Sequence, residues 1–257
     1  KTETFRGSGV MSACGGTVIY SGGGGGGGRI AILYQTLDAF DLTNKLTASS
    51  GSGGANGSAG TIYTRQKEED AGVLRIENGA VVSTVGTPLL RPDGTNDFEN
   101  LAIRGTNLIV ELPTGTVSAA SLLLVGSSIL IHPACTTNRE YSLNLFIHGP
   151  LTIATNCAID VSSRGYLPGR TLGNTTNGAS TGNSGGSYGG LGGGSTPNAI
   201  YGDALAPNES GSGGGSTYAG IGGGLVRIHA EALTVAGNIL ANGGNGASGW
   251  NAGGGSG

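Results

Sequence analysis

The chain has 257 residues, a formal net charge of −3, and charged side chains at only 11% of its positions. So sparse a charge provides no basic patch for nucleic acid and no cationic surface for an anionic membrane. No apolar run reaches the about 18 residues that a membrane-spanning helix needs, so we predict no membrane span.

Glycine accounts for 54 residues, about a fifth of the chain, where about 7% is usual. A collagen-like chain is excluded, because glycine has no three-residue period and proline contributes only eight residues. Hydrophobic residues still make up 37% of the chain and gather in short runs. We therefore expect glycine-rich segments to alternate with segments that form a core.

Residues 1–64 form the first glycine-rich section. Short runs of β-branched and aromatic residues at 17–20, 29–34 and 61–64 are bounded by turn-forming residues, and nothing between them is typical of a helix. Arg29 and Thr61 begin two of these runs and are 32 positions apart. We expect them to begin successive strands.

Residues 65–161 contain a measurable repeat. Two series recur at a spacing of 21 positions: Ile103, Leu124 and Leu145, and Ile109, Leu130 and Leu151. Within each run the apolar residues alternate, and glycine-containing breaks separate the runs, which excludes a helix. A coil of about 21 residues with two or three short strands predicts the rung of a right-handed parallel β-helix, a β-solenoid in which like side chains stack.

Residues 162–257 are a glycine-rich insertion followed by closing repeats. The composition is that of a disordered linker, yet tyrosine and leucine residues recur throughout it. We expect ordered loops and closely packed extended backbone on the solenoid, with polyglycine-type helices as one available conformation.

The end of the chain repeats its beginning. Residues 231–244 align without a gap on residues 3–16, so that Leu233 meets Phe5 and Ala241 meets Ala13. Glycine runs also precede both Arg29 and Arg227. Internal repetition of this kind predicts one continuous solenoid. We also expect residues 1–257 to be part of a longer or tandem-repeat chain, with the next strand beginning near position 259.

The order of these glycine-rich motifs resembles that of a known class of protein. AIDVSSRGY (158–166), GGSYGGLGG (185–193), GSGGG (211–215) and ILANGG (239–244) resemble glycine-rich repeat β-solenoid regions of very large secreted and cell-surface proteins. The resemblance covers most of residues 1–64 and 150–257. It implies an extracellular structural, adhesive or filament-forming protein, with no catalytic residues and no cofactor. One departure is Cys14, which stands where the companion repeat has Asn242.

The three cysteines do not form a Cys-x-x-Cys pair, so no zinc or redox motif is predicted. Cys135 and Cys157 are 22 positions apart, about one rung, and we predict a disulfide between them, with paired free thiols as the alternative. Cys14 is then left over, either buried or joined to a neighbouring unit.

Three Asn-x-Ser/Thr sequons occur in stretches expected to be exposed, at Asn56, Asn174 and Asn208. They predict a glycoprotein, although short sequons also arise by chance in a chain rich in Asn, Ser and Thr.

A polysaccharide-degrading β-helix enzyme needs clustered carboxylates. The candidates are Asp93, Asp97 and Glu99, Asp160 with Arg164, and Asp203 with Glu209. None stacks at the 21-residue period, so we predict no catalytic residue. His132, His148 and His229 are also off that period, and no metal or cofactor is predicted. The threonines keep no common register, which argues against an ice-binding face.

The sequence therefore predicts an extracellular structural module that assembles head-to-tail with copies of itself into a filament, fibre or cell-surface appendage. The alternative is a carbohydrate-binding surface adhesin. In that case the aromatic rings of Tyr166, Tyr188, Tyr201, Tyr218 and Trp250 would stack against surface glycans.

Overall fold

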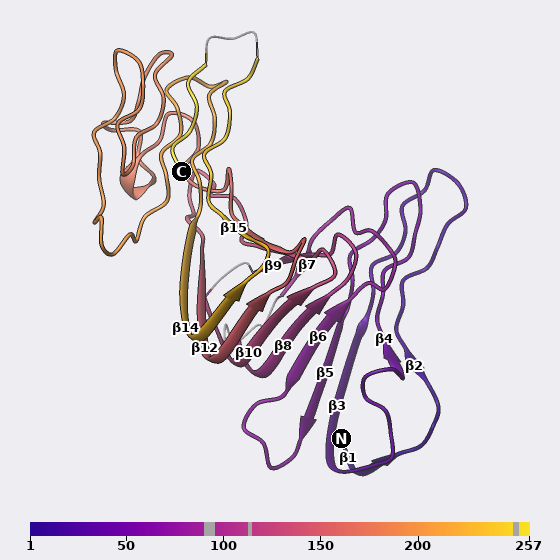
Figure 1. The fold of residues 1–257 in the computed structure, drawn as a ribbon. Coiled ribbons are helices and arrows are strands. Elements are labelled where there is room, and N and C mark those ends of the chain that lie inside the picture. Colours follow the sequence, from indigo (N-terminus) through magenta and orange to yellow (C-terminus); the bar gives the residue numbers. More distant parts are fainter. Residues whose placement is uncertain (90–95, 113–114, 249–251) are drawn as a thin grey trace.

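The computed structural model describes residues 1–89, 96–112, 115–248 and 252–257, and within them the fold is all-β (Figure 1). The larger sheet has the order β1 (Thr2–Arg6), β3 (Arg29–Asp38), β5 (Thr61–Gln66), β6 (Val73–Glu77), β8 (Asp97–Arg104), β10 (Thr116–Val125), β12 (Ser142–Ile153) and β14 (Leu225–Val235). A second sheet has the order β15 (Asn238–Leu240), β13 (Ala158–Asp160), β11 (Ile129–Ile131), β9 (Ile109–Glu111) and β7 (Thr87–Pro88). Strands β2 (Met11–Ser12) and β4 (Leu46–Thr47) form a small sheet, and Leu172–Asn174 form a short 3-10 helix.

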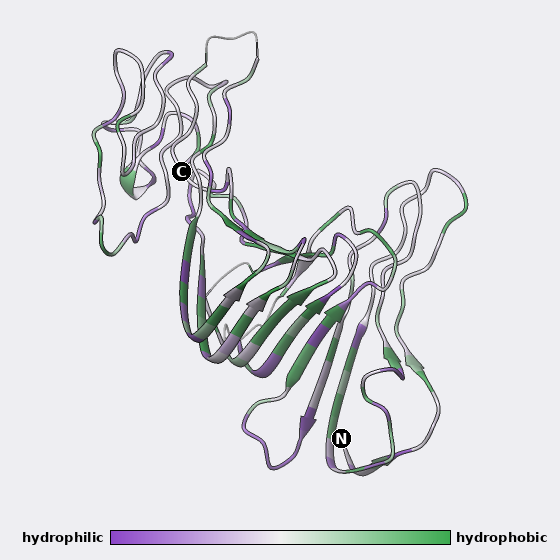
Figure 2. Cartoon of the chain, viewed as in Figure 1, coloured by the Kyte–Doolittle hydropathy of each residue, from purple (hydrophilic) through white to green (hydrophobic). Residues whose placement is uncertain are grey.

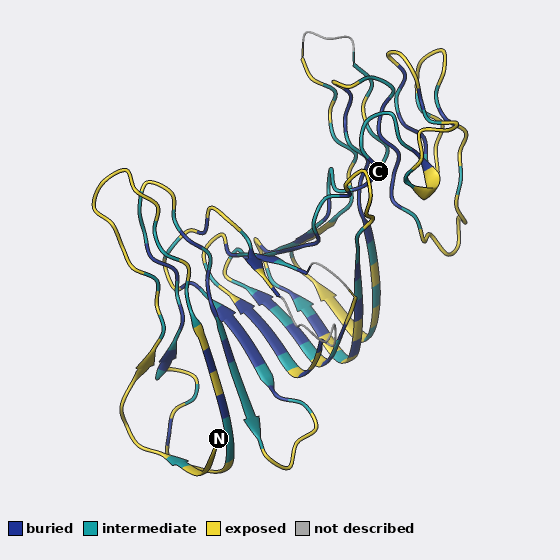
Figure 3. Ribbon diagram, turned by 180° about the vertical axis from the view of Figure 1, so that it is seen from behind, coloured by how far each residue is buried: buried dark blue, intermediate teal, exposed yellow. Residues whose placement is uncertain are grey.

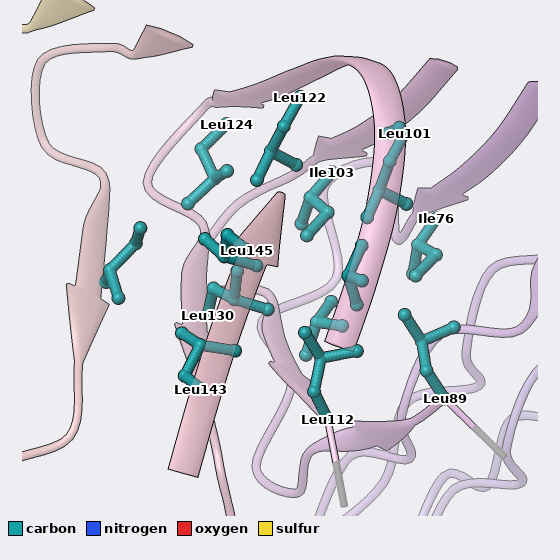
Figure 4. Packing of buried hydrophobic residues seen from close by; sticks show 14 of the residues in the cluster. Ile76, Leu89, Leu101, Ile103, Leu112, Leu122, Leu124, Leu130, Leu143 and Leu145 are labelled. Atoms are coloured by element: carbon teal, nitrogen blue, oxygen red, sulfur yellow. The ribbon is translucent and has the colours of Figure 1, made fainter. Parts of the chain in front are cut away.

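From β7 to β15 the chain visits the two larger sheets alternately. Each circuit adds one strand to each sheet, parallel to its predecessor. Inward Leu, Ile and Val side chains from both sheets form the main core, and Figure 4 shows them pointing toward one another. The alternating apolar residues thus fill the space between two sheets, as their period of two requires.

The 21-residue period is confirmed for one pair of strands and fails for the next. Leu124 on β10 pairs with Ile103 on β8, 21 positions away, but its other partner on β12 is Ile153, 29 positions away. The predicted stacking of Leu124 on Leu145 is therefore wrong. The segment before β12, residues 132–141, is longer than the one before β10, residues 112–115, and this lengthens the circuit. The second series also shifts, because Leu130 pairs with Val110 and Ile159.

The larger sheet contains one antiparallel pair, β5 with β6, and Figure 1 shows their arrows pointing in opposite directions. All the other pairs in the sheet are parallel. The predicted spacing of 32 between Arg29 and Thr61 is confirmed, because they pair on β3 and β5. Strands β1, β3 and β5 thus run opposite to the five strands from β6 to β14, a reversal that the sequence analysis did not predict.

The reversal at β5 and β6 also moves the core to the other face of the sheet. Tyr63 lies opposite Leu74, and both contact the main core. Ile62 lies opposite Arg75 and belongs to a second, smaller core with Ile30 and Leu46. Because neighbouring residues on a strand point to opposite faces, the two cores lie on opposite sides of the shared sheet.

Arg75 joins the two halves at this reversal. Its side chain is buried, and its two terminal nitrogens donate hydrogen bonds to the carbonyl oxygens of Leu42 at 2.9 Å and Leu46 at 3.0 Å. Glu77 Oε2 lies 3.2 Å from Nε and forms an ion pair. Burial lowers the pKa of the guanidinium and Glu77 opposes this shift, so the group remains charged.

The glycine-rich segments form two lobes at opposite ends of the sheets, and Figure 2 shows them mostly pale on either side of the green strands. We call residues 13–28 with 48–60 the N-lobe and residues 162–224 with 241–257 the C-lobe, of which 249–251 are not described. In both lobes extended segments are joined by backbone hydrogen bonds, such as Gly25 N to Gly16 O at 2.9 Å and Gly255 N to Gly244 O at 2.9 Å. Backbone hydrogen bonds therefore order both lobes, and in the C-lobe side-chain hydrogen bonds around Asn198 add to them.

Some positions in the lobes require glycine because there is no room for a Cβ atom. A Cβ atom added to Gly27 would overlap the Ala48 carbonyl oxygen and the Gly60 nitrogen. On Gly16, in the same lobe, it would meet nothing within 4 Å. Neighbouring backbones therefore pack at distances that only a residue without a side chain permits.

We expect Arg75→Met to lower the free energy of unfolding by about 2–3 kcal/mol, because it leaves two buried carbonyl oxygens without their charged donor. Urea denaturation followed by far-ultraviolet circular dichroism measures the change. Arg104→Met is the matched control, since Arg104 is exposed on the neighbouring strand β8. Equal losses in the two variants would contradict this role for Arg75.

We expect Gly27→Ala to destabilise the protein by about 1–3 kcal/mol, the usual cost of overpacking. Gly16→Ala should be neutral, because its added methyl group meets open space. Thermal unfolding of the two variants tests this contrast. If both melt at the wild-type temperature, the N-lobe is packed less closely than described here.

Candidate functional site

The two ends of the larger sheet are built from the same sequence unit. By the repeat, residues 230–234 of β14 correspond to β1, and residues 239–240 of β15 correspond to β2. Strands β1 and β14 are the two edge strands of that sheet, and each is paired on one side among the described residues. The chain thus carries related rungs at its two open edges.

No strand among the described residues covers the main core beyond β14 and β15. Leu233, Val235 and Ile239 are 48%, 45% and 38% exposed. Their partners one rung inward are Leu151, Ile153 and Ile159, which are all fully buried. Figure 3 shows exposed residues along this edge and buried residues along the strands inside it. The exposed side chains continue the apolar ladders, with no further rung over them.

The β1–β2 edge exposes fewer apolar side chains from its core than the β14–β15 edge does. Phe5 packs against Phe40 in the smaller core, with ring centroids 4.4 Å apart, while Val10 and Met11 are exposed. Strand β2 pairs with β4 on one side. This edge therefore offers backbone hydrogen-bonding groups together with a small apolar surface.

Cys14 follows β2 at this edge and is an exposed free thiol, so the expectation that it is buried is wrong. That it joins to a neighbouring unit stays a prediction. The hydroxyls of Ser12 and Ser49 donate hydrogen bonds to its sulfur at 3.3 and 3.1 Å. With Thr47 they lower the pKa of the thiol to about 7, Ser12 having the largest effect. The thiolate is the reactive form, so Cys14 is poised to react near neutral pH.

The predicted bridge between Cys135 and Cys157 is not formed, and both are buried free thiols. The register explains why. Cys135 N bonds to Arg164 O, while Cys157 lies opposite Ser128, whose hydroxyl is 3.6 Å from its sulfur. The local offset of 29 residues places the two cysteines at different points along their rungs rather than one above the other.

The tyrosines predicted as a glycan-stacking surface divide into three groups. Tyr166 is fully buried and donates a hydrogen bond to Glu140 Oε2 at 3.0 Å, so its assignment to that surface was wrong. Burial also raises the pKa of Tyr166 above its ordinary value. Tyr218 is half-exposed, and Trp250 lies outside the described residues. Tyr188 and Tyr201 are brought together, with ring centroids 5.0 Å apart and an interplanar angle of 49°.

Tyr188 and Tyr201 line a cavity of about 360 Å³ on the C-lobe. Its wall is completed by Gly189, Ile200, Gly202, Asp203, Ala204 and Pro207. Burial raises the pKa of Tyr201, whose hydroxyl donates to Ser210 O at 2.6 Å and accepts from Ser212 at 3.0 Å. Tyr188 donates to Glu209 Oε2 at 3.4 Å. Both hydroxyls are used inside the lobe.

The cavity rests on the buried amide of Asn198. Its two N–H groups are shared among four acceptors, Ala199 O at 2.8 Å and Thr171 Oγ1, Ser187 O and Ser212 Oγ at 3.1 Å each. Its oxygen accepts from Ser187 N at 2.7 Å. A fully bonded buried amide fixes the surrounding loops, and the sequence gives no signal that distinguishes Asn198 from the other asparagines of the C-lobe.

The three sequons lie in different surroundings. Asn208 is exposed, while Asn56 and Asn174 are partly buried. The amide nitrogens of those two donate to Val82 O and Thr136 O, at 2.8 Å each. Glycosylation remains a prediction, and Asn208 is the most accessible of the three.

The acidic residues weighed as catalytic candidates are dispersed. Asp97 and Glu99 are exposed on β8, and Asp93 lies outside the described residues. Asp160 accepts the Ser162 N–H in a turn, and Arg164 donates to His132 O. Asp203 and Glu209 are the pair that the fold brings to one place, beside the tyrosine cavity. Within the described part of the chain no three His, Cys, Asp or Glu residues are placed to hold a metal ion.

One of the three histidines is buried, and the other two lie on the outer face of the larger sheet. His132 is fully buried, and desolvation lowers its pKa to about 4, so the ring is neutral. A side chain on Gly224 would overlap its imidazole, which shows how closely the C-lobe meets the main core there. His148 and His229 flank Phe146 on the outer face of the larger sheet, with ring centroids 4.8 and 4.6 Å from it.

Comparison of the chain with protein-family models, with curated proteins and with solved structures finds no match. Among the described residues, no helix has the length and apolar character needed to cross a bilayer.

We expect the alkylation rate of Cys14 to rise with pH to a half-maximum near pH 7, because its pKa is lowered to about 7. Iodoacetamide labelling followed by peptide mass spectrometry measures the profile. Ser12→Ala should move the midpoint upward, while Ser21→Ala, which removes an exposed hydroxyl elsewhere in the N-lobe, should not. A midpoint near 9 in all three proteins would contradict the hydrogen-bonded thiolate.

Proposed function

We propose that the chain is an extracellular structural module whose copies associate head-to-tail, building a filament, fibre or cell-surface appendage. The β14–β15 edge of one copy would meet the β1–β2 edge of the next. Rigidity would come from the sheets, since parallel ladders resist bending along the stacking direction. The resemblance to secreted and cell-surface β-solenoid regions supports an extracellular location.

The finer architecture that we infer is a right-handed parallel β-helix over β6 to β15, flanked by lobes of polyglycine-type segments. Crossovers between parallel strands of one sheet are right-handed in about 98% of cases. Extended backbones that bond to several neighbours and exclude Cβ atoms are consistent with a polyglycine-type lattice. The handedness and the lattice type are both part of the proposal.

The observation that carries the proposal is the uncovered end of the main core at Leu233, Val235 and Ile239. Fully burying a leucine, isoleucine or valine side chain contributes about 1.5–3 kcal/mol. The unpaired backbone groups of β14 provide the directional part of the contact. A second copy placed on this edge would bury the three side chains and pair with the backbone groups of β14.

Strand direction is compatible with this contact. Strands β1 and β14 run in opposite senses, so a copy repeated along the sheet would pair them antiparallel. The chain already contains such a junction at β5 and β6, where Tyr63 from β5 packs over the main core. A β14–β1 contact would repeat an arrangement that the fold already accommodates.

We expect Leu233→Lys and Ile239→Lys to raise the protein concentration needed for assembly about tenfold or more, since each places a charge at the contact. Sedimentation velocity and negative-stain electron microscopy measure the assembly. Leu205→Lys is the control, because Leu205 is 96% exposed on the C-lobe and away from both edges. In the assembled wild type, Cys14 should also be alkylated more slowly than in Leu233→Lys.

Three results would count against the proposal. They are a monomer at all concentrations, a closed dimer that never extends, and assembly that is indifferent to Leu233→Lys. A closed dimer would point to two β14–β15 edges paired about a two-fold axis rather than head-to-tail contact.

A further inference from the structure

We propose that the cavity between Tyr188 and Tyr201 on the C-lobe binds a neutral pyranose sugar. This inference is independent of the assembly proposal, since the cavity lies on the C-lobe and uses neither sheet edge. At about 360 Å³ its volume falls within the range of small-ligand sites. Its lining combines two aromatic rings and an aliphatic side chain with few polar groups, the usual composition of such sites.

The tyrosine rings supply the apolar part of the site. Their hydroxyls are bound inside the lobe, to Ser210 and Glu209, so the rings rather than the hydroxyls are left to contact a ligand. Ile200 adds a side chain that is 59% exposed at the cavity. One face of a pyranose carries C–H groups, and such a face packs on an aromatic ring.

Asp203 supplies the polar part of the lining, and Glu209 lies behind it, in contact with the Tyr188 hydroxyl. Asp203 Oδ1 accepts the N–H groups of Leu205 at 2.7 Å and Ala206 at 3.3 Å, which fixes the carboxylate at the cavity wall. Glu209 Oε2 accepts Tyr188 and the Asn208 N–H. Carboxylate oxygens have further lone pairs, and sugar hydroxyls are donors that such acceptors bind strongly.

The charge around the cavity selects among ligands. No lysine, arginine or histidine is among the residues that line the cavity, so the lining offers no cation to neutralise an acidic sugar beside Asp203. A cation could also approach the rings. However, the hydrogen bonds already made to both carboxylates disperse part of their charge, which favours a neutral ligand with hydroxyl donors.

The site is formed in advance of binding. Asn198 holds the loops beneath it through both ends of its side-chain amide: the two N–H groups are shared among acceptors on Thr171, Ser187, Ala199 and Ser212, and the oxygen accepts from Ser180 Oγ and Ser187 N. Gly202 has a φ of 82°, and a Cβ there would lie 2.8 Å from both Tyr188 Cε2 and Glu209 Oε2. Glycine at this position therefore keeps the space beside the Tyr188 ring open. Little ordering is needed on binding, which lowers its entropic cost.

Titration calorimetry and ligand-observed NMR with the whole chain test the site. The probes are the methyl pyranosides of glucose, galactose and mannose, with choline and galacturonate as the cationic and anionic comparisons. For a ligand of this size we expect at least one methyl pyranoside to bind with a dissociation constant on the order of 1 mM. Choline and galacturonate should bind at least tenfold more weakly.

Variants connect the binding to the cavity. Tyr188→Ala should weaken binding at least tenfold, and Tyr188→Phe should retain it, because the ring rather than the hydroxyl makes the contact. Tyr218→Ala is the matched control, a half-exposed tyrosine of the same lobe outside the cavity lining, and should bind as the wild type does. If Tyr188→Ala does not fold, Ile200→Asp tests the site from an exposed position.

The proposal is overturned if none of the three pyranosides binds saturably, if choline binds more tightly than all of them, or if Tyr218→Ala and Tyr188→Ala lose binding equally. Leu233→Lys, designed against assembly, should bind sugar as the wild type does. Failure of one proposal therefore leaves the other separately measurable.

Discussion

Everything in this fold depends on backbone hydrogen bonding between segments that lie side by side, one circuit after another. In the sheets this pairing places Leu124 over Ile103 and under Ile153, so that the core is a consequence of register. In the glycine-rich segments of the lobes the same kind of pairing brings backbones into direct contact, and Gly27 packs where a methyl group would overlap Ala48. In the sheets, apolar side chains fill the space beside the backbone. In the lobes, another backbone segment fills it.

Because the core follows from strand pairing, one sheet can contain strands that run in two opposite directions. A uniform stack would keep all strands parallel and all inward residues on one face. The β5–β6 pair reverses the strands and at the same time transfers the core to the opposite face. Arg75 reaches from the sheet into the smaller half and satisfies carbonyl oxygens that would otherwise be buried without donors. A charged residue is suited to this position because its fork of donors spans two acceptors.

The same pairing leaves the functional features of the molecule at its margins. Wherever pairing ends, backbone groups and the last apolar residues of each ladder face outward, as at Leu233 and Ile239. The C-lobe, which has little core of its own, instead presents side chains held by polar contacts around Asn198. Stiff sheets with open edges and a lobe with a small cavity would suit a surface protein that both assembles and binds. The proposed assembly edge and the proposed sugar site use separate residues.

The sequence by itself determined the local features: short strands with a period of two, the strand pairing of Arg29 with Thr61, and ordered rather than linker-like glycine segments. Alternation and glycine content act within a few residues, and the pairing of Arg29 with Thr61 follows from the spacing of two similar runs that each begin after a glycine-rich segment. Only the tertiary structure decided the reversal between β5 and β6, the burial of Tyr166, the separation of Cys135 from Cys157, and the meeting of Tyr188 with Tyr201. Each depends on how many residues a loop adds to a circuit, and no local pattern records that number. A shift of eight residues between one circuit and the next, as at β12, was enough to move the predicted partners Leu124 and Leu145 apart while leaving every inward residue facing the core.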